Sequence, residues 1–234
     1  MARRTDKKSL EDYLYYEEEN PSLKIYCGDC LDIMPLLPKV DLVVTDPPYG
    51  CIGGSKAIGG SNFVRANQYD TEWDNSRFSV EQLKSLTEKS KHQVIWGVNY
   101  FWDYFKPTNS LIVWDKKCQN GWDDTFSDAE IAWTSFESKL LVYRHLWVGA
   151  LKKPKTDDGN RVHPTQKPTQ LIKFCIQQSK YYDIPLTILD PFLGSGTTLV
   201  ACKELNRNGI GIEISEKYCE IAKTRLQNTT RSLF

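Results

Sequence analysis

The chain has 234 residues, of which 40% are hydrophobic and 26% are charged, proportions that are ordinary for a globular protein with a large core. Thirty basic and 30 acidic residues give a formal net charge of zero, which excludes a global positive field as the means of holding nucleic acid. No apolar run approaches a membrane span, and the N-terminus lacks the apolar core of a secretory signal, so we expect a cytoplasmic protein.

The first part of the chain predicts short strands and one long loop. Residues 1–20 are polar and predict a short helix or a flexible arm. Alternating apolar residues predict a strand at 22–27, and VDLVVT at 40–45 predicts a second strand that is buried on both faces, as in a parallel sheet. Residues 51–77 are rich in Gly, Ser and Asn, and so long a loop without periodicity is usually functional or disordered.

Helical and extended patterns alternate from residue 79 onward. We predict helices at 79–90, 167–182, 198–206 and 215–227, and strands at 93–97, 110–117, 130–136, 139–147, 185–190 and 209–214. The two late strands, 130–136 and 139–147, are expected to pair antiparallel. The alternation predicts an α/β fold with a mostly parallel sheet and helices on both faces, organised as a single domain over residues 1–234.

Cysteine and histidine usage predicts neither disulfides nor a metal site. The seven cysteines are an odd number scattered along the chain, which argues against a disulfide framework. Cys27 and Cys30 have the spacing of half a zinc site, but no second pair of ligands is present and the histidines are far apart.

A glycine-containing loop, ILDPFLGSGTT at 188–198, follows one predicted strand and opens a predicted helix. Gly194 and Gly196 permit a tight turn, and the free N–H groups of the helix point at whatever binds there. Glu213 ends the next strand, and an acid about 20 residues after such a loop reads a ribose hydroxyl in nucleotide-binding units. The alternative is an ordinary strand–helix turn.

The chemistry around this loop favours a ligand without phosphate. The Lys-Ser/Thr pair of a phosphate-binding loop is absent, and Asp190 at the strand tip would repel a pyrophosphate. S-adenosylmethionine fits, because it carries a ribose, a sulfonium and an amino group.

Carboxylates follow or end several predicted strands. Asp46 and Asp190 end two strands, and Asp29 and Asp115 follow or end two more. Ligands lie outside the carboxyl ends of parallel strands, so we expect these four acids to rim one cleft. For any single strand-end Asp the competing interpretation is a turn or helix cap.

The sequence Asp46-Pro47-Pro48-Tyr49 predicts a rigid surface of hydrogen-bond acceptors. Each proline lacks an N–H and has a fixed φ, and the residue before each proline is held extended. The segment therefore suits a planar –NH2 group, such as the exocyclic amine of adenine or cytosine, whose attacking form two acceptors would favour. Tyr49 would stack on a base drawn out of its helix.

DPPYG at 46–50 and DPFLGSGTT at 190–198 together resemble the amino-group DNA methyltransferases, which modify adenine N6 or cytosine N4. The DPPY segment comes before the glycine loop, as in the permuted β-type subgroup. RVHPTQKP at 161–168 and WDK at 114–116 match further family segments. The resemblance spans roughly residues 23–228.

The resemblance implies a Rossmann-like, mostly parallel sheet of seven strands with helices on both faces, one late antiparallel strand and a circularly permuted motif order. It implies S-adenosylmethionine as cofactor, double-stranded DNA as partner, base flipping and direct methyl transfer, as in restriction–modification systems. It implies no membrane and no metal, and members of the subgroup often form homodimers.

The resemblance also implies roles for individual residues. Asp46, Pro47, Pro48 and Tyr49 would hold the target amine and its base. The residues expected to contact the cofactor are Asp29, Cys30, Asp46, Thr165, Lys167, Asp190, Phe192, Gly194, Gly196, Thr197, Thr198 and Glu213. Asp29 and Cys30 would meet the adenine ring, and Glu213 the ribose hydroxyls.

DNA recognition is the point at which the sequence departs from the family. The segment before HPTQKP, where members often carry a recognition segment, is very short. Specificity is therefore low, or loop 51–77 faces the DNA or acts as a lid, or a second subunit contributes. Residues expected to contact DNA are Arg65, Lys152, Lys153, Lys155, Arg161 and His163. A solvated loop explains the basic residues equally well.

Competing functions remain open. Adenine is favoured over cytosine N4, because in the family Ser in place of Asp46 is the commoner N4 pattern. RNA guanine-N2 transfer is more remote, since those enzymes usually place the cofactor loop first. A binding module without activity is opposed by the intact Asp46, Gly194, Gly196 and Glu213. Cytosine-C5 transfer needs a cysteine nucleophile, and no Pro-Cys pair occurs.

Overall fold

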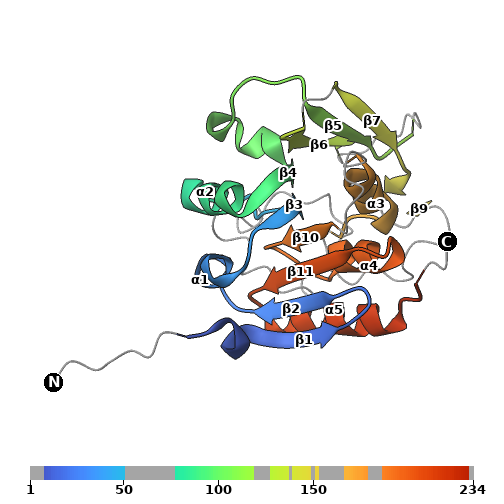
Figure 1. The fold of residues 1–234 in the computed structure, drawn as a ribbon. Helices are drawn as coiled ribbons and strands as arrows, with labels where there is room; N and C mark the ends of the chain where they lie inside the picture. The colour runs from blue at the N-terminus through green and yellow to red at the C-terminus, as the bar shows by residue number, and fades with distance from the viewer. Residues whose placement is uncertain are drawn as a thin grey trace, which may run out of the picture.

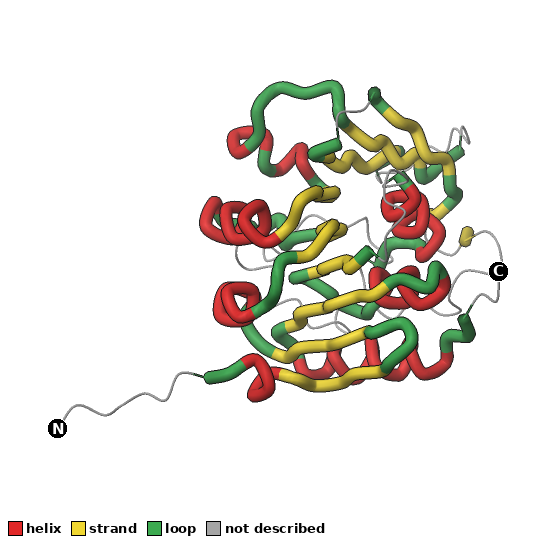
Figure 2. The backbone as a smooth tube through the Cα atoms, in the orientation of Figure 1, coloured by secondary structure: helices red, strands yellow, loops and turns green. Residues whose placement is uncertain are grey.

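The computed structural model describes residues 8–50, 77–118, 127–136, 139–148, 151–152, 166–178 and 186–231. A large sheet with helices on both faces forms the molecule (Figure 1, Figure 2). Its strands are β1 Leu14–Glu18, β2 Leu23–Cys27, β3 Val40–Thr45, β4 Ser90–Trp96, β5 Leu111–Asp115, β6 Ala129–Thr134, β7 Leu141–Arg144, β10 Thr187–Asp190 and β11 Asn208–Glu213. None of the helices in the described residues is long and apolar enough to span a bilayer.

Helices precede or follow the parallel strands. They are α1 Cys30–Ile33, α2 Val80–Lys89, α3 Thr169–Gln177, α4 Thr197–Glu204 and α5 Glu216–Asn228. Short 3-10 turns are η1 Leu10–Tyr13, η2 Met34–Leu36, η5 Val98–Tyr100 and η6 Trp102–Tyr104, and a separate two-stranded ribbon joins β8 Trp147–Val148 to β9 Leu151–Lys152.

The strand order is β1-β2-β11-β10-β3-β4-β6-β5-β7. β2, β11, β10, β3 and β4 pair parallel, β6 is antiparallel to both of its neighbours, and β7 is parallel to β5. The carboxyl ends of the parallel strands therefore meet at one edge of the sheet, and the antiparallel β6 begins at that same edge. This arrangement confirms the mostly parallel α/β fold.

Two expectations about the sheet are wrong. It has nine strands, against seven implied by the resemblance and eight predicted from the patterns, and the unpredicted strand is β1, which residues expected to form an arm or a helix contribute and which pairs antiparallel with β2. The two late strands do not pair with each other, because β5 lies between them: Ile112 is in register with Ala132 of β6 and with Leu141 of β7. The pairing partner of a strand depends on its neighbours in space, which its own periodicity does not specify.

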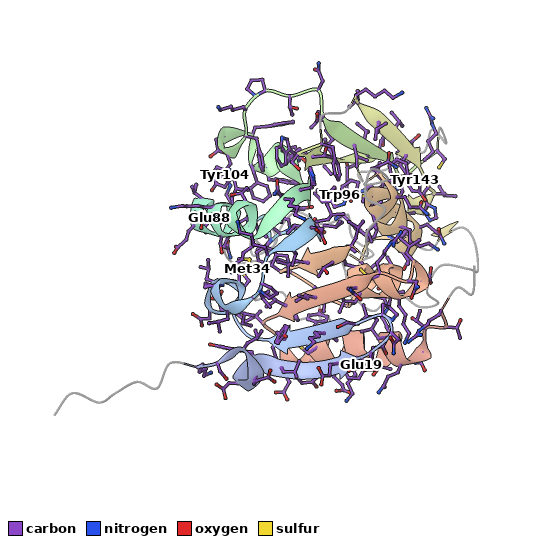
Figure 3. All side chains as sticks on the ribbon, in the orientation of Figure 1. Glu19, Met34, Glu88, Trp96, Tyr104 and Tyr143 are labelled. Carbon is purple, nitrogen blue, oxygen red and sulfur yellow. The ribbon has the colours of Figure 1, made fainter. Side chains whose placement is uncertain are left out.

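The sheet is buried on both faces. Leu42 and Val44 of β3 join the cluster formed by α3, α4 and α5, whereas Val43 faces the cluster formed with α1 and α2. All three side chains are at most 1% exposed, as expected for an apolar run in a parallel strand. Trp96, at the end of β4, belongs to the first cluster and lies toward α3 (Figure 3).

Candidate active site

A cavity opens where the carboxyl ends of β2, β3, β10 and β11 meet. Residues with a predicted site role that line it are Asp29, Cys30, Asp46, Pro48, Lys167, Phe192, Gly194, Thr197, Thr198 and Glu213. Segments that are distant in the sequence therefore come together in one cavity, as the spacing of the motifs predicted. The assigned roles of these residues stay predictions.

The glycine loop between β10 and α4 has a backbone that only glycine adopts readily. Gly194 has φ +54° and Gly196 has φ +87°, in the left-handed region. A Cβ on Gly196 would lie 2.7 Å from the Cβ of Ala222 on α5, so a side chain here would push the loop away from that helix.

Glu213, at the end of β11, holds the same loop with its carboxylate. Oε2 accepts from the Gly194 N–H at 2.7 Å, and Oε1 accepts from the Ser215 N–H at 2.9 Å. Burial raises the pKa of Glu213, and these two N–H donors oppose that rise. The carboxylate lines the cavity and has acceptor positions left for a hydroxyl group.

Arg225 on α5 fixes the loop from the other side, and no motif marked it. Its Nη1 donates to the Ser195 carbonyl oxygen at 2.7 Å, to Ser195 Oγ at 3.0 Å and to Thr197 Oγ1 at 3.1 Å. The only sequence signal was its place on the helix after the βαβ unit, one turn beyond Ala222, which contacts Gly196.

Asp190 was expected to contact the cofactor, but it does not line the cavity. It supports the glycine loop with its carboxylate. Its Oδ1 accepts from Thr45 Oγ1 at 2.8 Å and from the Phe192 N–H at 3.1 Å, and its Oδ2 accepts from Thr198 Oγ1 at 2.6 Å. Burial raises the pKa of Asp190 to about 6, against the effect of these donors.

Asp115 does not join the other acids at the rim either. Its Oδ1 accepts from the backbone N–H groups of Lys117 and Cys118. Asp115 therefore stabilises a turn, which was the competing interpretation for a strand-end Asp. β6 lies between its strand, β5, and the parallel strands. Of the four acids expected at the rim, Asp29 and Asp46 line the cavity, and Asp115 and Asp190 do not; Glu213 is a third carboxylate in the described lining.

Asp46 follows β3 directly and lines the cavity. Its Oδ1 accepts a hydrogen bond from the Tyr49 hydroxyl, and its Oδ2 accepts one from Lys167 Nζ. Burial raises the pKa of Asp46, whereas the Lys167 ammonium counteracts that rise. The motif and the lysine, 121 residues apart, therefore meet at one carboxylate.

Two further charged residues extend this contact: Glu130, which sequence reasoning missed, and Lys116 from the WDK segment. Glu130 Oε2 lies 3.2 Å from Lys167 Nζ, and its Oε1 lies 3.0 Å from Lys116 Nζ. Burial alone would raise the pKa of Glu130, but the two ammonium groups lower it to about 2. The signal that could have found Glu130 is positional: it is the second residue of β6, the strand that begins at the edge where the parallel strands end.

Tyr49 packs among aromatic rings beside Asp46. Its ring stacks on Tyr100, with centroids 4.4 Å apart and planes 17° apart, and Phe101 is tilted against it at 5.9 Å. A Cβ on Gly97 would come within 2.1 Å of Tyr49 Cε1, so a glycine is required where the chain leaves β4.

Asp29 and Cys30 form the part of the cavity next to α1. Asp29 caps this helix by accepting from the Leu31 N–H at 2.8 Å, and it remains exposed. Burial raises the pKa of the Cys30 thiol to about 12, so the thiol stays neutral, and Gln82 Nε2 lies 3.7 Å from its sulfur.

The remaining predicted site residues lie away from the cavity lining or outside the described residues. Those outside the described residues are Arg65, Lys153, Lys155, Arg161, His163 and Thr165. Lys152 lies in β9, in register with Trp147 of β8. Pro47 is buried next to Asp46 and does not line the cavity.

The model of the DNA methylase family, whose members modify N6 or N4 amines, matches residues 81–224, which is more than half of the chain. The chain belongs to the DNA methylase family. It is an amino-group DNA methyltransferase that depends on S-adenosylmethionine, as the motifs predicted. The matched range includes the glycine loop and Glu130 but begins after Asp46.

Similar proteins extend the family match over most of the chain. The type II methyltransferase M.HinfI of Haemophilus influenzae is 28% identical over 94% of this chain and 70% of its own length. Two solved structures have the same fold. The M1.HpyAVI–SAM complex has a TM-score of 0.54 at 24% identity, covering 87% of this chain and 98% of its own. The PvuII cytosine-N4-specific methyltransferase has a TM-score of 0.51 at 17% identity, covering 89% and 94%.

The cavity itself fits S-adenosylmethionine better than a nucleotide phosphate. Three carboxylates, from Asp29, Asp46 and Glu213, line it, and they suit hydroxyl groups and a cationic centre. Lys167, a cation in the lining, is already paired with Asp46 and Glu130. Gly196 lets the loop pack closely against α5, because a Cβ there would meet Ala222 and displace the loop that lines the cavity.

Proposed function

We propose that the chain methylates the N6 amine of adenine in double-stranded DNA. The observation that carries the proposal is the Asp46 carboxylate, which ends a buried parallel strand, faces the cofactor cavity and precedes two prolines. The carboxylate is a hydrogen-bond acceptor for the target amine, and it lies beside the cavity in which the methyl donor would be held.

In this proposal the glycine loop and Glu213 hold the cofactor. The start of α4, where Thr197 and Thr198 line the cavity, supplies hydrogen-bond donors to the cofactor. Glu213 accepts hydrogen bonds from the ribose hydroxyls. Asp29 and Cys30 border the adenine. When bound, S-adenosylmethionine supplies a methyl group on a sulfonium, whose carbon–sulfur electron pair stays with sulfur on transfer.

Asp46 and its neighbours act on the target base. The Asp46 carboxylate and the Pro47 carbonyl accept the two N–H bonds of the amine, so that the nitrogen lone pair is free to form the bond to the methyl carbon. Asp46 is then the nearest acceptor for the proton that the methylated nitrogen releases. A base that stacks on Tyr49 takes the place of Tyr100, which covers one face of the ring.

Adenine is preferred because the first residue of the motif is an aspartate, Asp46. In cytosine-N4 enzymes a serine is commoner at this position. The alternative is cytosine N4, to which the same acceptors apply, and the likeness to the PvuII enzyme concerns the fold alone. RNA guanine-N2 transfer remains the more remote alternative.

In the deciding experiment, the purified chain and methyl-labelled S-adenosylmethionine are incubated with genomic DNA, which is then digested to nucleosides. In a parallel reaction, duplex DNA and RNA compete for the label. We expect label only in N6-methyladenine and no competition by RNA. Label only in N4-methylcytosine would refute the choice of base, and preferential labelling of RNA would refute the substrate.

Three further assignments belong to the same proposal. The chain is placed in the permuted β-type subgroup, because Asp46 precedes the glycine loop in the chain. Recognition of DNA is assigned to loop 51–77 and to the basic residues near 152–163, with a homodimer as a second source of contacts. The substrate places the enzyme in the compartment that holds the cell's DNA, which we take to be the cytoplasm.

A further inference from the structure

We propose that Glu130 is a positioning residue for methyl transfer, which acts through Lys167. It holds the Lys167 ammonium against one oxygen of Asp46, so that the other oxygen is left for the target amine, and it cancels the positive charge that Lys167 brings to the reaction centre. This inference rests on the proposed function of Asp46.

The four charges form one continuous chain of contacts. Asp46 Oδ2 meets Lys167 Nζ, Lys167 Nζ lies 3.2 Å from Glu130 Oε2, and Glu130 Oε1 lies 3.0 Å from Lys116 Nζ. The Lys167 side chain is 7% exposed and that of Lys116 is 16% exposed. A buried lysine between two carboxylates has its position fixed by both, because losing either contact leaves a charge without its partner.

The two oxygens of Asp46 are held differently. Oδ2 faces a buried cation that two carboxylates anchor, whereas Oδ1 faces the neutral hydroxyl of Tyr49. A neutral donor is exchanged more readily than a buried ion pair, so the amine of a flipped base takes Oδ1. Without Glu130 the Lys167 ammonium has one anchor and can move along the Asp46 carboxylate.

Charge balance provides the second part of the argument. Methyl transfer brings a cationic donor next to Asp46 and leaves positive charge on the attacked nitrogen. An unpaired ammonium at this point would oppose that charge, and the opposition would be strong because the site is poorly exposed to water. Glu130 and Asp46 together carry two negative charges against Lys167, and Lys116 lies at the far side of Glu130.

The same contacts predict how the pH dependence responds. The groups that face Asp46 in the described residues are Tyr49 on its own segment, Lys167 before α3, Glu130 on β6 and Asp190 on β10. Of these, Lys167 favours the ionised form of Asp46, and Glu130 opposes it. Removing Glu130 therefore lowers the pKa of Asp46, and removing Lys167 raises it.

The test uses Glu130→Gln, with Glu88→Gln as a matched control on the exposed side of α2, where Glu88 pairs with Lys84 at 3.9 Å. Turnover, KM for DNA and the dissociation constant of S-adenosylmethionine are measured, with melting temperature and the fluorescence of 2-aminopurine at the target position. We expect kcat to fall at least tenfold in Glu130→Gln, with both binding constants within threefold. The control should match the wild type.

The pH profile of kcat distinguishes positioning from support of the fold. The acid limb should move to lower pH in Glu130→Gln and to higher pH in Lys167→Met. Glu130→Asp, which keeps the charge, should restore a wild-type acid limb and part of the rate. A kcat within twofold of wild type in Glu130→Gln would overturn the proposal. So would a rate loss with an unmoved acid limb, or equal losses of rate and melting temperature in Glu130→Gln and Glu130→Asp.

Failure of the proposed function gives a different result. Transfer to cytosine by the wild type would refute the choice of adenine, and the ratio of variant to wild type would then be measured on cytosine. The acid limb shift is the same in either case, because it depends on Asp46 and not on the ring that carries the amine.

Discussion

At the scale of single residues, Asp46 and Asp190 are both strand-end aspartates, yet their surroundings give them different tasks. Asp46 faces the cavity and contacts Lys167 and Tyr49, whereas Asp190 is enclosed by Thr45, Thr198 and the backbone of Phe192. Both are aspartates at or directly after the end of a parallel strand, and both precede a proline. The difference lies in which donors the fold brings to each carboxylate.

Replacing Asp46 should affect turnover and spare cofactor binding. In Asp46→Ala we expect kcat to fall about a hundredfold or more, as when a preorganised polar contact to a transition state is lost. The affinity for S-adenosylmethionine, measured by titration calorimetry, should stay within tenfold, because the glycine loop and Glu213 remain. Unimpaired turnover in this variant would contradict the assigned role.

Asp190 should make the stability of the protein without cofactor depend on pH. Its folded-state pKa of about 6 lies above the ordinary value of 3.8, so the protonated form favours folding. This stabilisation is complete below about pH 4 and is lost as the pH rises through 6, a change of about 3 kcal/mol. In urea unfolding at pH 4.5 and 7, the wild type should lose more stability than Asp190→Asn. Equal losses in both proteins would show that the prediction is wrong.

At the scale of elements, the glycine loop is held in place by its neighbours on both sides. Glu213 from β11 accepts from Gly194, and Arg225 from α5 donates to Ser195 and Thr197. The motif predicted that a loop would bind the cofactor. It contained no information on the arginine that fixes its shape, because that residue comes from the next helix.

Arg225→Met should therefore weaken cofactor binding without altering the fold. We expect the dissociation constant of S-adenosylmethionine to rise about tenfold, the cost of losing hydrogen bonds to a charged group. The control is Lys223→Met on the same helix, whose partner is the surface residue Glu220 at 3.1 Å, and it should stay within twofold. An unchanged constant in Arg225→Met would show that the loop keeps its shape without the arginine.

At the scale of the whole molecule, β1 closes one edge of the sheet and is tied to a helix far along the chain. Glu18, the last residue of β1, contacts Lys203 Nζ of α4 at 2.9 Å, and the same ammonium donates to the Leu226 carbonyl oxygen at 2.8 Å. The side chains of Lys203 and Glu18 are 11% and 18% exposed. This buried contact joins the start of the chain to its last two helices.

Glu18→Ala should lower the free energy of unfolding by about 2 kcal/mol, because it leaves the buried ammonium of Lys203 without its carboxylate. The neighbouring Glu17→Ala is the control. Glu17 pairs with Lys24 at 3.3 Å on the surface, and its loss should cost less than about 0.5 kcal/mol. Urea unfolding of both variants tests the prediction, and equal effects would contradict it.

The sequence by itself determined the α/β class, the parallel strands, the cofactor and the protein family. These follow from local causes: apolar runs such as 40–45 are buried on two faces, glycines at 194 and 196 permit a turn, and the prolines after Asp46 remove donors. Each of these properties belongs to a few consecutive residues, so it can be recognised without knowledge of the fold.

The tertiary structure decided the contacts that these local properties leave open. Residues 14–18 became a strand because β2 offered a free edge, and β5 lies between the two late strands. Asp190 and Asp115 turned from the cavity toward protein donors, while Glu130 joined Lys167 at Asp46. The physical reason is the same for all of them: a charge or an edge is satisfied by whichever partner the packing of distant segments brings within reach.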